Sequence, residues 1–245
     1  MYISFMRNCN ASPCGVVEDG DMENGVLGNN IVFLTGTVTS QPQYSHSVCS
    51  EAFYNLSIEV ARLSGYCDIL PVTASERLLE GLDLENGKML HITGQLRSYN
   101  RCINGANRLL LTVFAKDVQQ AEGQPHTPNE ITLEGFICKA PTYRTTPFGR
   151  EIADVMLAVN RSYGKSDYIP CICWGRNARF ASNLQVGEKI KVFGRIQSRE
   201  YEKALEGGES ETRVAYEVSI CQMERIEAQK SRPDEEKMQE DIQAP

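Results

Sequence analysis

The sequence has little of what marks several large classes of protein. It contains one tryptophan and three histidines among 245 residues. No apolar run approaches the roughly 18 to 20 residues that cross a bilayer, and the opening residues are too short and too poor in basic charge for a signal peptide. We therefore expect a cytoplasmic protein without membrane association. The formal charge of −7 also removes the simplest argument for nucleic-acid binding, which starts from a basic surface.

Groups that could carry catalysis are also missing. The three histidines (His46, His91 and His126) are isolated from one another, and no glycine-rich loop ends in Lys-Ser or Lys-Thr. Nine cysteines without a signal peptide indicate reduced thiols rather than a disulfide framework. Cys171 and Cys173 alternate along a predicted strand, and we interpret them as small core residues because no second Cys or His pair would complete a metal site. We expect no enzymatic activity, metal or cofactor.

What the sequence does contain is an internal repeat. Leu34, Gly36, Pro42 and Tyr44 recur 99 residues later as Leu133, Gly135, Pro141 and Tyr143. About a dozen matches keep an offset of 99 or 100, which predicts two copies of one domain. We expect five segments: a disordered extension (1–28), a first domain (29–122), a linker (123–129), a second domain (130–227) and a flexible acidic tail (228–245).

Within each copy the apolar residues alternate with a period of two, which is typical of strands with one buried face. A short helix is predicted between the third and fourth strands, over Ser75–Leu82 in the first copy and Asn177–Leu184 in the second. About five strands and one helix in some 95 residues describe a five-stranded Greek-key barrel of the OB type. The fold class is therefore all-β, with two tandem barrels, whose strand glycines such as Gly135 and Gly194 suit the bends of a small barrel.

The aromatic residues of the second copy suggest a binding surface. In the segment YIPCICW, alternation places Ile169, Cys171 and Cys173 inside the barrel, and Tyr168, Ile172 and Trp174 on its outer face. Outward aromatic rings beside arginine side chains can stack on unpaired bases. The nearby arginines are Arg161, Arg176, Arg195 and Arg199. From alternation alone, Trp174 could equally cap the barrel or fill a protein interface.

The second copy resembles the bacterial single-stranded DNA-binding protein family. The resemblance lies in LEG (133–135), LAVNRSY (157–163), YIPCICWGR (168–176) and FGRIQSREYE (193–202). It implies a protein that coats unwound DNA in replication, recombination and repair. It also implies base stacking by Tyr163 after the second strand of the copy, by Tyr168 and Trp174 on the third strand, and by Tyr201 in the loop after the fourth.

The first copy resembles the family only through the repeat, and most of the stacking residues are absent from it. Ile69 and Ser75 stand at the positions of Tyr168 and Trp174, and Arg101 stands at that of Tyr201, with Tyr99 nearby. We expect the second copy to be the main contact with DNA. The first copy would serve packing, self-association or a weaker electrostatic section of the DNA path.

The resemblance also implies an assembly and partners. Members of the family present four barrels to DNA, so two barrels in one chain suggest a homodimer. Many end in an acidic tip with a terminal Pro-Phe that recruits replication and repair proteins, whereas this sequence ends in Ile-Gln-Ala-Pro, so a solubilising tail is an equal alternative. The competing interpretation of the whole chain is an accessory or scaffold subunit of the replication machinery that mainly binds protein. A choice of DNA over RNA rests on the resemblance alone.

Overall fold

The computed structural model describes residues 28–103, 106–123, 125, 127–204 and 210–227, and the chain there is almost entirely β-structure. The disorder predicted for 1–28 and the tail predicted for 228–245 therefore fall outside the described residues, apart from Gly28. The first half consists of β1 (Asn30–Val38), β2 (Gln43–Val48), β3 (Glu51–Ala61), β4 (Cys67–Ser75), α1 (Glu76–Leu79), β5 (Met89–Ile103) and β6 (Ala106–Gln120). The second half consists of β7 (Asn129–Thr145), β8 (Glu151–Asn160), the 3-10 turn η1 (Ser162–Gly164), β9 (Ser166–Trp174), α2 (Arg176–Ala181), β10 (Lys189–Ala204) and β11 (Ser210–Arg225).

In each half, five strands close into a ring. In the first half β1 pairs with β5, β5 with β6, β6 with β4, β4 with β3 and β3 again with β1. In the second half the ring runs β7, β10, β11, β9, β8 and back to β7. Only the β4–β6 and β9–β11 pairings are parallel. We call these rings the first and second barrels; β2 extends the first by pairing with β3.

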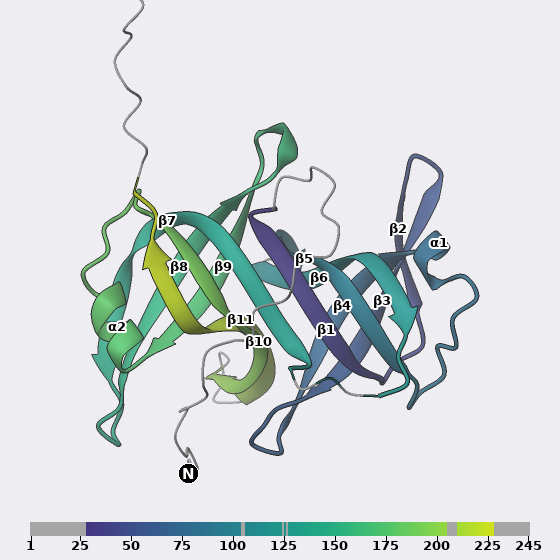
Figure 1. Ribbon diagram of the computed structural model, residues 1–245, viewed down its shortest axis with the longest axis horizontal. Coiled ribbons are helices and arrows are strands. Elements are labelled where there is room, and N and C mark those ends of the chain that lie inside the picture. Colours follow the sequence, from purple (N-terminus) through teal and green to yellow (C-terminus); the bar gives the residue numbers. More distant parts are fainter. Residues whose placement is uncertain (1–27, 104–105, 124, 126, 205–209, 228–245) are drawn as a thin grey trace, which may run out of the picture.

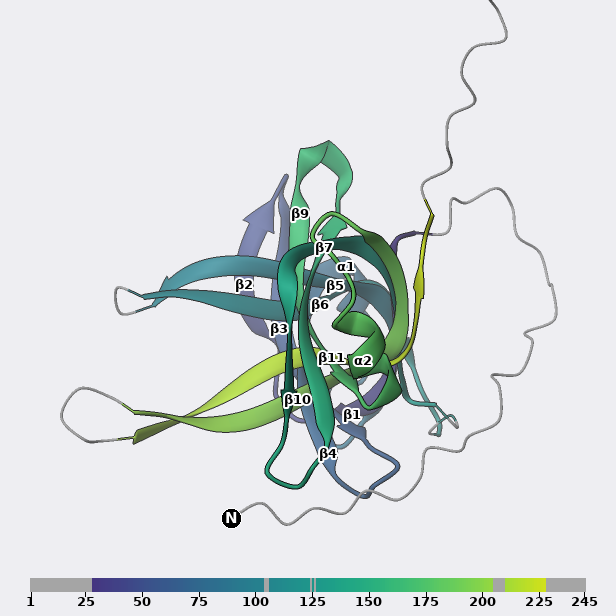
Figure 2. The same ribbon diagram turned by 90° about the vertical axis from the view of Figure 1, so that its left-hand side faces the viewer.

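The two barrels are joined along one antiparallel pair of strands. β1 pairs with β7 from Asn30 opposite Leu133 to Leu34 opposite Asn129, so both barrels belong to one continuous sheet. Figure 1 shows the barrels side by side, with β1 and β7 between them. In Figure 2 the β5–β6 and β10–β11 hairpins project from the same side of the molecule. β7 begins at Asn129, the last residue of the predicted linker, which pairs with Leu34 of β1 and whose side chain bonds the backbone N–H and C=O of Ile196.

Alternation explains both the core and the closure of the barrels. The inward residues of β9, namely Ile169, Cys171 and Cys173, are at most 2% exposed, as the sequence predicted. A Cβ at Gly135 would lie 2.5 Å from the carbonyl oxygen of Ala158, so only glycine lets these two strands approach so closely. Gly194 stands at the register shift between β10 and β11. The two helices are shorter than predicted, because α1 spans four residues and α2 spans six.

Candidate nucleic-acid interface

The outer face of β9 carries the two aromatic residues that alternation places there. Tyr168 is 47% exposed and Trp174 is half-buried. The strand rises about 3.3 Å per residue, so about 20 Å separates them. Ile172, between them on the same face, is only 6% exposed, although it does not belong to the core cluster that contains Ile169, Cys171 and Cys173. It stands in the middle of three paired strands, between Asp154 on β8 and Ser219 on β11, where its neighbours cover it.

Tyr201 lies within β10 and not in a loop after it, which corrects the expectation from the sequence. The β10–β11 ladder continues past Tyr201, which is opposite Arg213, as far as Ala204. The Tyr201 ring is 38% exposed, and the guanidinium carbon of Arg199 lies 5.9 Å from its centroid. Arg199 Nε also lies 3.8 Å from a carboxylate oxygen of Glu217. Tyr201 and Arg199 thus form a cation–π pair on a projecting hairpin.

Arg161 is engaged between the two barrels. Its Nε donates to Asp167 Oδ2 at 2.5 Å, and its Nη2 donates to the carbonyl oxygen of Ser98 on the first barrel at 2.8 Å. The backbone N–H of Ser98 donates in turn to Asp167 Oδ1 at 2.5 Å, and Ser98 Oγ accepts from the N–H of Tyr168 at 2.7 Å. Ser98 of the first barrel therefore holds both the Arg161–Asp167 pair and the backbone of Tyr168 in place. A contact between Arg161 and a DNA phosphate stays a prediction.

The repeat places a matching arrangement on the other side of the interface. Arg62 donates to both carboxylate oxygens of Asp68, and its Nη2 donates to the carbonyl oxygen of Ser198 at 2.9 Å. The N–H of Ser198 donates to Asp68 Oδ1 at 2.6 Å. Burial alone would raise the pKa of the Asp68 carboxyl, but hydrogen bonds from Arg62 and Ser198 outweigh it, so this pKa lies below its usual value. We call the two arrangements the Arg–Asp clasps.

A second arginine approaches the carboxylate of each clasp. Arg97 Nη1 lies 3.7 Å from Asp167, and Arg195 Nη1 lies 3.7 Å from Asp68. At the Asp167 clasp, two guanidinium groups beside one carboxylate favour a nearby anion such as a phosphate. At the Asp68 clasp the negative charge of Glu217 also acts on Arg62. Burial, followed by the charge of Arg161, lowers the pKa of Arg97.

Sequence reasoning selected Arg195 but missed Arg97. The repeat could have indicated Arg97. GQLR (94–97) in the first copy aligns with GRIQ (194–197) in the second, with the positions of Arg and Gln exchanged.

The two remaining predicted residues lie on the segments that precede and follow β9. Arg176 is exposed at the first turn of α2, two residues after Trp174. Tyr163 belongs to η1 between β8 and β9, as expected, but its side chain lies outside the described part of the chain. The structure thus brings Arg161 and Arg97 together around Asp167, the residue before Tyr168. It places Trp174 at the other end of β9, and Tyr201 and Arg199 on the β10–β11 hairpin.

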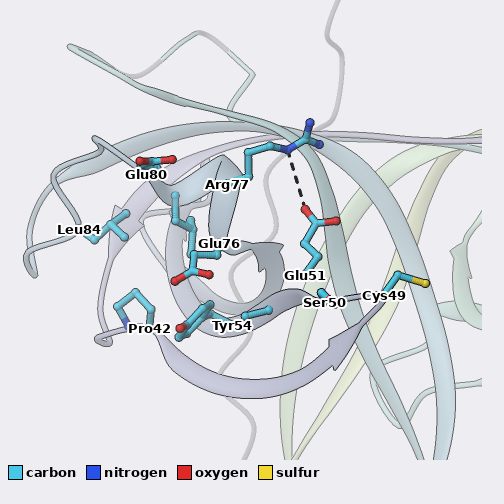
Figure 3. Close-up of a pocket in the computed structure, with 11 residues that line it drawn as sticks. Pro42, Cys49, Ser50, Glu51, Tyr54, Glu76, Arg77, Glu80 and Leu84 are labelled. Carbon is cyan, nitrogen blue, oxygen red and sulfur yellow. Dashed lines mark ion pairs between the residues drawn. The ribbon is translucent and has the colours of Figure 1, made fainter.

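A surface groove on the first barrel has the wrong charge for DNA. It has a volume of about 820 Å³ and runs between α1 and the turn that joins β2 to β3. In Figure 3 the carboxylates of Glu51, Glu76 and Glu80 line it, and only Arg77 offsets them, 3.9 Å from Glu51. Such a groove repels a polyanion.

The described residues hold no cluster of three or more His, Cys, Asp or Glu side chains that could ligate a metal. No helix among them is long and apolar enough to span a membrane.

Comparison with known proteins decides the family. Residues 128–226 match the model of the single-strand binding protein family. The chain is 40% identical to single-stranded DNA-binding protein B of Bacillus subtilis, over 30% of this chain and 72% of that protein. This chain belongs to the single-strand binding protein family. It is also 41% identical to single-stranded DNA-binding protein 1 of Staphylococcus aureus, but there it spans only 48% of the relative's length, again with 30% of its own.

A solved structure extends the likeness to both barrels. A deletion mutant of the single-stranded DNA binding protein from Thermus aquaticus superposes with a TM-score of 0.67 at 25% identity. It covers 85% of this chain and 98% of the solved chain. The predictions of the family and of an all-β OB-type fold are therefore confirmed for this member of the single-strand binding protein family.

Proposed function

We propose that this chain binds single-stranded DNA with little sequence preference, through the outer face of the second barrel. The observation that carries the proposal is the exposed Tyr168 ring on β9, the residue that directly follows Asp167 and its two arginines along the chain, in a chain of the single-strand binding protein family. Tyr168, Trp174 and Tyr201, together with Tyr163, would stack on bases. Arg176, Arg195 and Arg199 would contact phosphates, since every base offers a ring face and every nucleotide a charge.

The wider role follows from this binding mode. A protein that stacks on unpaired bases without reading them would coat and protect unwound DNA during replication, recombination and repair. We further propose that residues 29–122 and 130–227 are the two folding units, supported by their closed strand rings. Two further elements of the proposal are that two chains assemble into a homodimer and that the protein acts in the cytoplasm without catalysis. A role confined to protein binding has less support, because it leaves the Tyr168 surface unexplained.

The first experiment measures affinity for a labelled oligo-dT strand by fluorescence anisotropy. Trp174→Ala removes one stacking ring and should weaken binding by about 1 to 3 kcal/mol. The matched control, Trp174→Tyr, keeps a ring at the same position and should bind nearly as well as the wild type. Equal affinity of the wild type and the alanine variant would remove Trp174 from the site. Failure of the wild type to prefer single-stranded over duplex DNA would refute the proposal.

A second readout concerns phosphate contacts. Binding that neutralises phosphates releases counterions, so the logarithm of the affinity should fall linearly with the logarithm of the salt concentration. Replacing Arg199 by Gln removes one phosphate contact, so the slope should become shallower by the amount that one neutralised phosphate contributes. Binding that does not respond to salt would contradict a phosphate-binding surface.

A further inference from the structure

The first barrel lacks the aromatic residues of the second on its equivalent strand, but a neighbouring strand supplies one. Ser75 on β4 stands where Trp174 stands on β9. Directly opposite Ser75, on β3, lies Phe53. Directly opposite Trp174, on β8, lies Ile152. Opposed residues of paired strands have Cβ atoms about 5 Å apart. The first barrel therefore carries a ring at the same patch of the outer face as Trp174 in the second barrel, but on the neighbouring strand.

Phe53 is the centre of a row of three rings that we call the aromatic row: His46, Phe53 and Phe114. His46 stacks on Phe53 with centroids 5.1 Å apart and planes within 9° of each other. Phe114 lies 5.6 Å from Phe53 on the other side, with an interplanar angle of 32°. His46 is exposed, and both phenylalanines are half-buried. The row therefore crosses from β2 over β3 to β6 on the surface of the barrel.

The row leads towards the second barrel. The guanidinium carbon of Arg97 lies 5.9 Å from the centroid of Phe114, and its Nη1 lies 3.7 Å from Asp167. Asp167 immediately precedes Tyr168, whose N–H bonds Ser98. Three rings and a cation thus follow one another from His46 to Arg97, and Tyr168 is the next residue along β9 after the carboxylate that Arg97 approaches. Rings followed by a cation are what a single strand with alternating bases and phosphates requires.

The aromatic row is not needed to cover the polar side chains beneath it. Thr73, on the same face of β4, donates to Asn55 at 2.8 Å and lies 2.9 Å from the hydroxyl of Thr112, so this group is satisfied without the rings. His46 adds a ring at the exposed end of the row, where it buries little surface. The face consists of the rings of His46, Phe53 and Phe114 next to an arginine. Aromatic rings beside a cation are the side chains that a base-stacking surface uses.

We propose that the aromatic row is a second base-stacking surface, which takes unpaired bases of the strand that leaves Tyr168. This inference rests on the proposed function, because it extends the DNA path of the second barrel onto the first. It also goes beyond the expectation that the first copy, which lacks most of the stacking residues, would add only packing, self-association or a weaker electrostatic section of the DNA path. The residues concerned stand where the second copy has Arg144, Ile152 and Ser219, so they could not be found by matching the two copies.

The test uses the full chain and two lengths of oligo-dT. An OB barrel occupies about 4 to 16 nucleotides, so a strand of about 8 nucleotides fills the second barrel alone and one of about 35 reaches both. The double variant Phe53→Leu/Phe114→Leu keeps apolar bulk but removes two rings. It should bind the long strand about tenfold more weakly than the wild type and should bind the short strand equally well. The matched control, Tyr44→Leu, alters an exposed ring of the same hairpin that contacts Tyr54 and should leave both affinities unchanged.

Two measurements keep the outcomes distinct. Thermal melting monitored by circular dichroism shows whether the double variant is folded. Ultraviolet cross-linking of the unaltered protein to oligo-dT, followed by peptide mapping, should yield adducts on the peptides that carry His46, Phe53 or Phe114. Equal long-strand affinity of the variant and an absence of these adducts would overturn the aromatic row while leaving the second-barrel proposal intact. If the wild type bound neither strand, the proposed function itself would fail.

Discussion

The backbone N–H of Ser198, in the second barrel, donates a hydrogen bond of 2.6 Å to Asp68, in the first. The carboxylate that receives it is 1% exposed and is also held by Arg62. The equivalent bond runs the other way, from Ser98 to Asp167. Each barrel thus contributes one buried carboxylate and one serine to a contact that the β1–β7 pairing alone would not fix.

Asp68→Asn should destabilise the protein strongly. Asparagine cannot neutralise Arg62, and removal of one member of a buried pair leaves the other uncompensated, so we expect a loss of about 3 kcal/mol in the free energy of unfolding. The matched control is Asp154→Asn, because the Arg144–Asp154 pair is about half exposed on both sides and should contribute less than about 1 kcal/mol. Guanidinium unfolding followed by the fluorescence of Trp174 measures both. Equal losses for the two variants would contradict the role of the clasp.

The same carboxylate predicts a dependence of stability on pH. The pKa of Asp68 is lower in the folded protein than its usual value, so the native state binds this proton more weakly than the unfolded chain does. Its contribution is present at pH values above the unfolded-state pKa and is lost as the pH falls through the folded-state pKa. The difference in melting temperature between the wild type and Asp68→Asn should be constant from about pH 5 to 7 and shrink below about pH 4. A difference that persists down to about pH 2 would argue against this linkage.

Gly135→Ala should disturb the closure of the second barrel. The added methyl group would lie 2.5 Å from the backbone carbonyl oxygen of Ala158, so β7 and β8 would have to separate. We expect a cost of about 1 to 3 kcal/mol in the free energy of unfolding. Gly123→Ala is the control, because nothing lies within 4 Å of the added atom there, and its effect should stay within about 0.5 kcal/mol. Chemical denaturation curves of the two variants test the difference.

The two cysteines of β9 should be chemically inert in the folded protein. Burial raises the pKa of Cys171 well above its usual value, and burial with a smaller effect of Asp154 raises that of Cys173 to about 12. Because the thiolate is the reactive form, an alkylating agent at neutral pH should label exposed cysteines such as Cys49 and Cys67 and spare these two. Peptide mass spectrometry before and after denaturation measures this. Labelling of Cys171 in the native protein would show that the barrel interior opens.

The sequence was most informative where a residue's environment depends on its own strand. The period of two placed Ile169, Cys171 and Cys173 inside and Tyr168 outside, and the repeat identified paired copies of one fold. The period of two did not reveal that Ile172 is buried, because the burial of an outward residue depends on the neighbouring strands. Sequence reasoning failed for Tyr201 because the length of a hairpin depends on pairing that composition does not reveal.

The clasps and the aromatic row were beyond sequence reasoning for a related reason. Arg161 and Ser98 are 63 residues apart, and Phe53 opposes Ser75 only through the β3–β4 register. Comparison of the two copies position by position detects what both retain. It cannot detect a ring that has moved to an adjacent strand.

The antiparallel join of β1 to β7 has a consequence for how this molecule can change over time. Separate subunits encoded by one gene are identical, so every alteration in a homodimer that meets through such a join appears twice. Here the two partners are encoded in tandem and remain together at any dilution. One of them is free to drift toward a new surface while the other keeps the inherited one, and each molecule still carries both in a fixed one-to-one ratio.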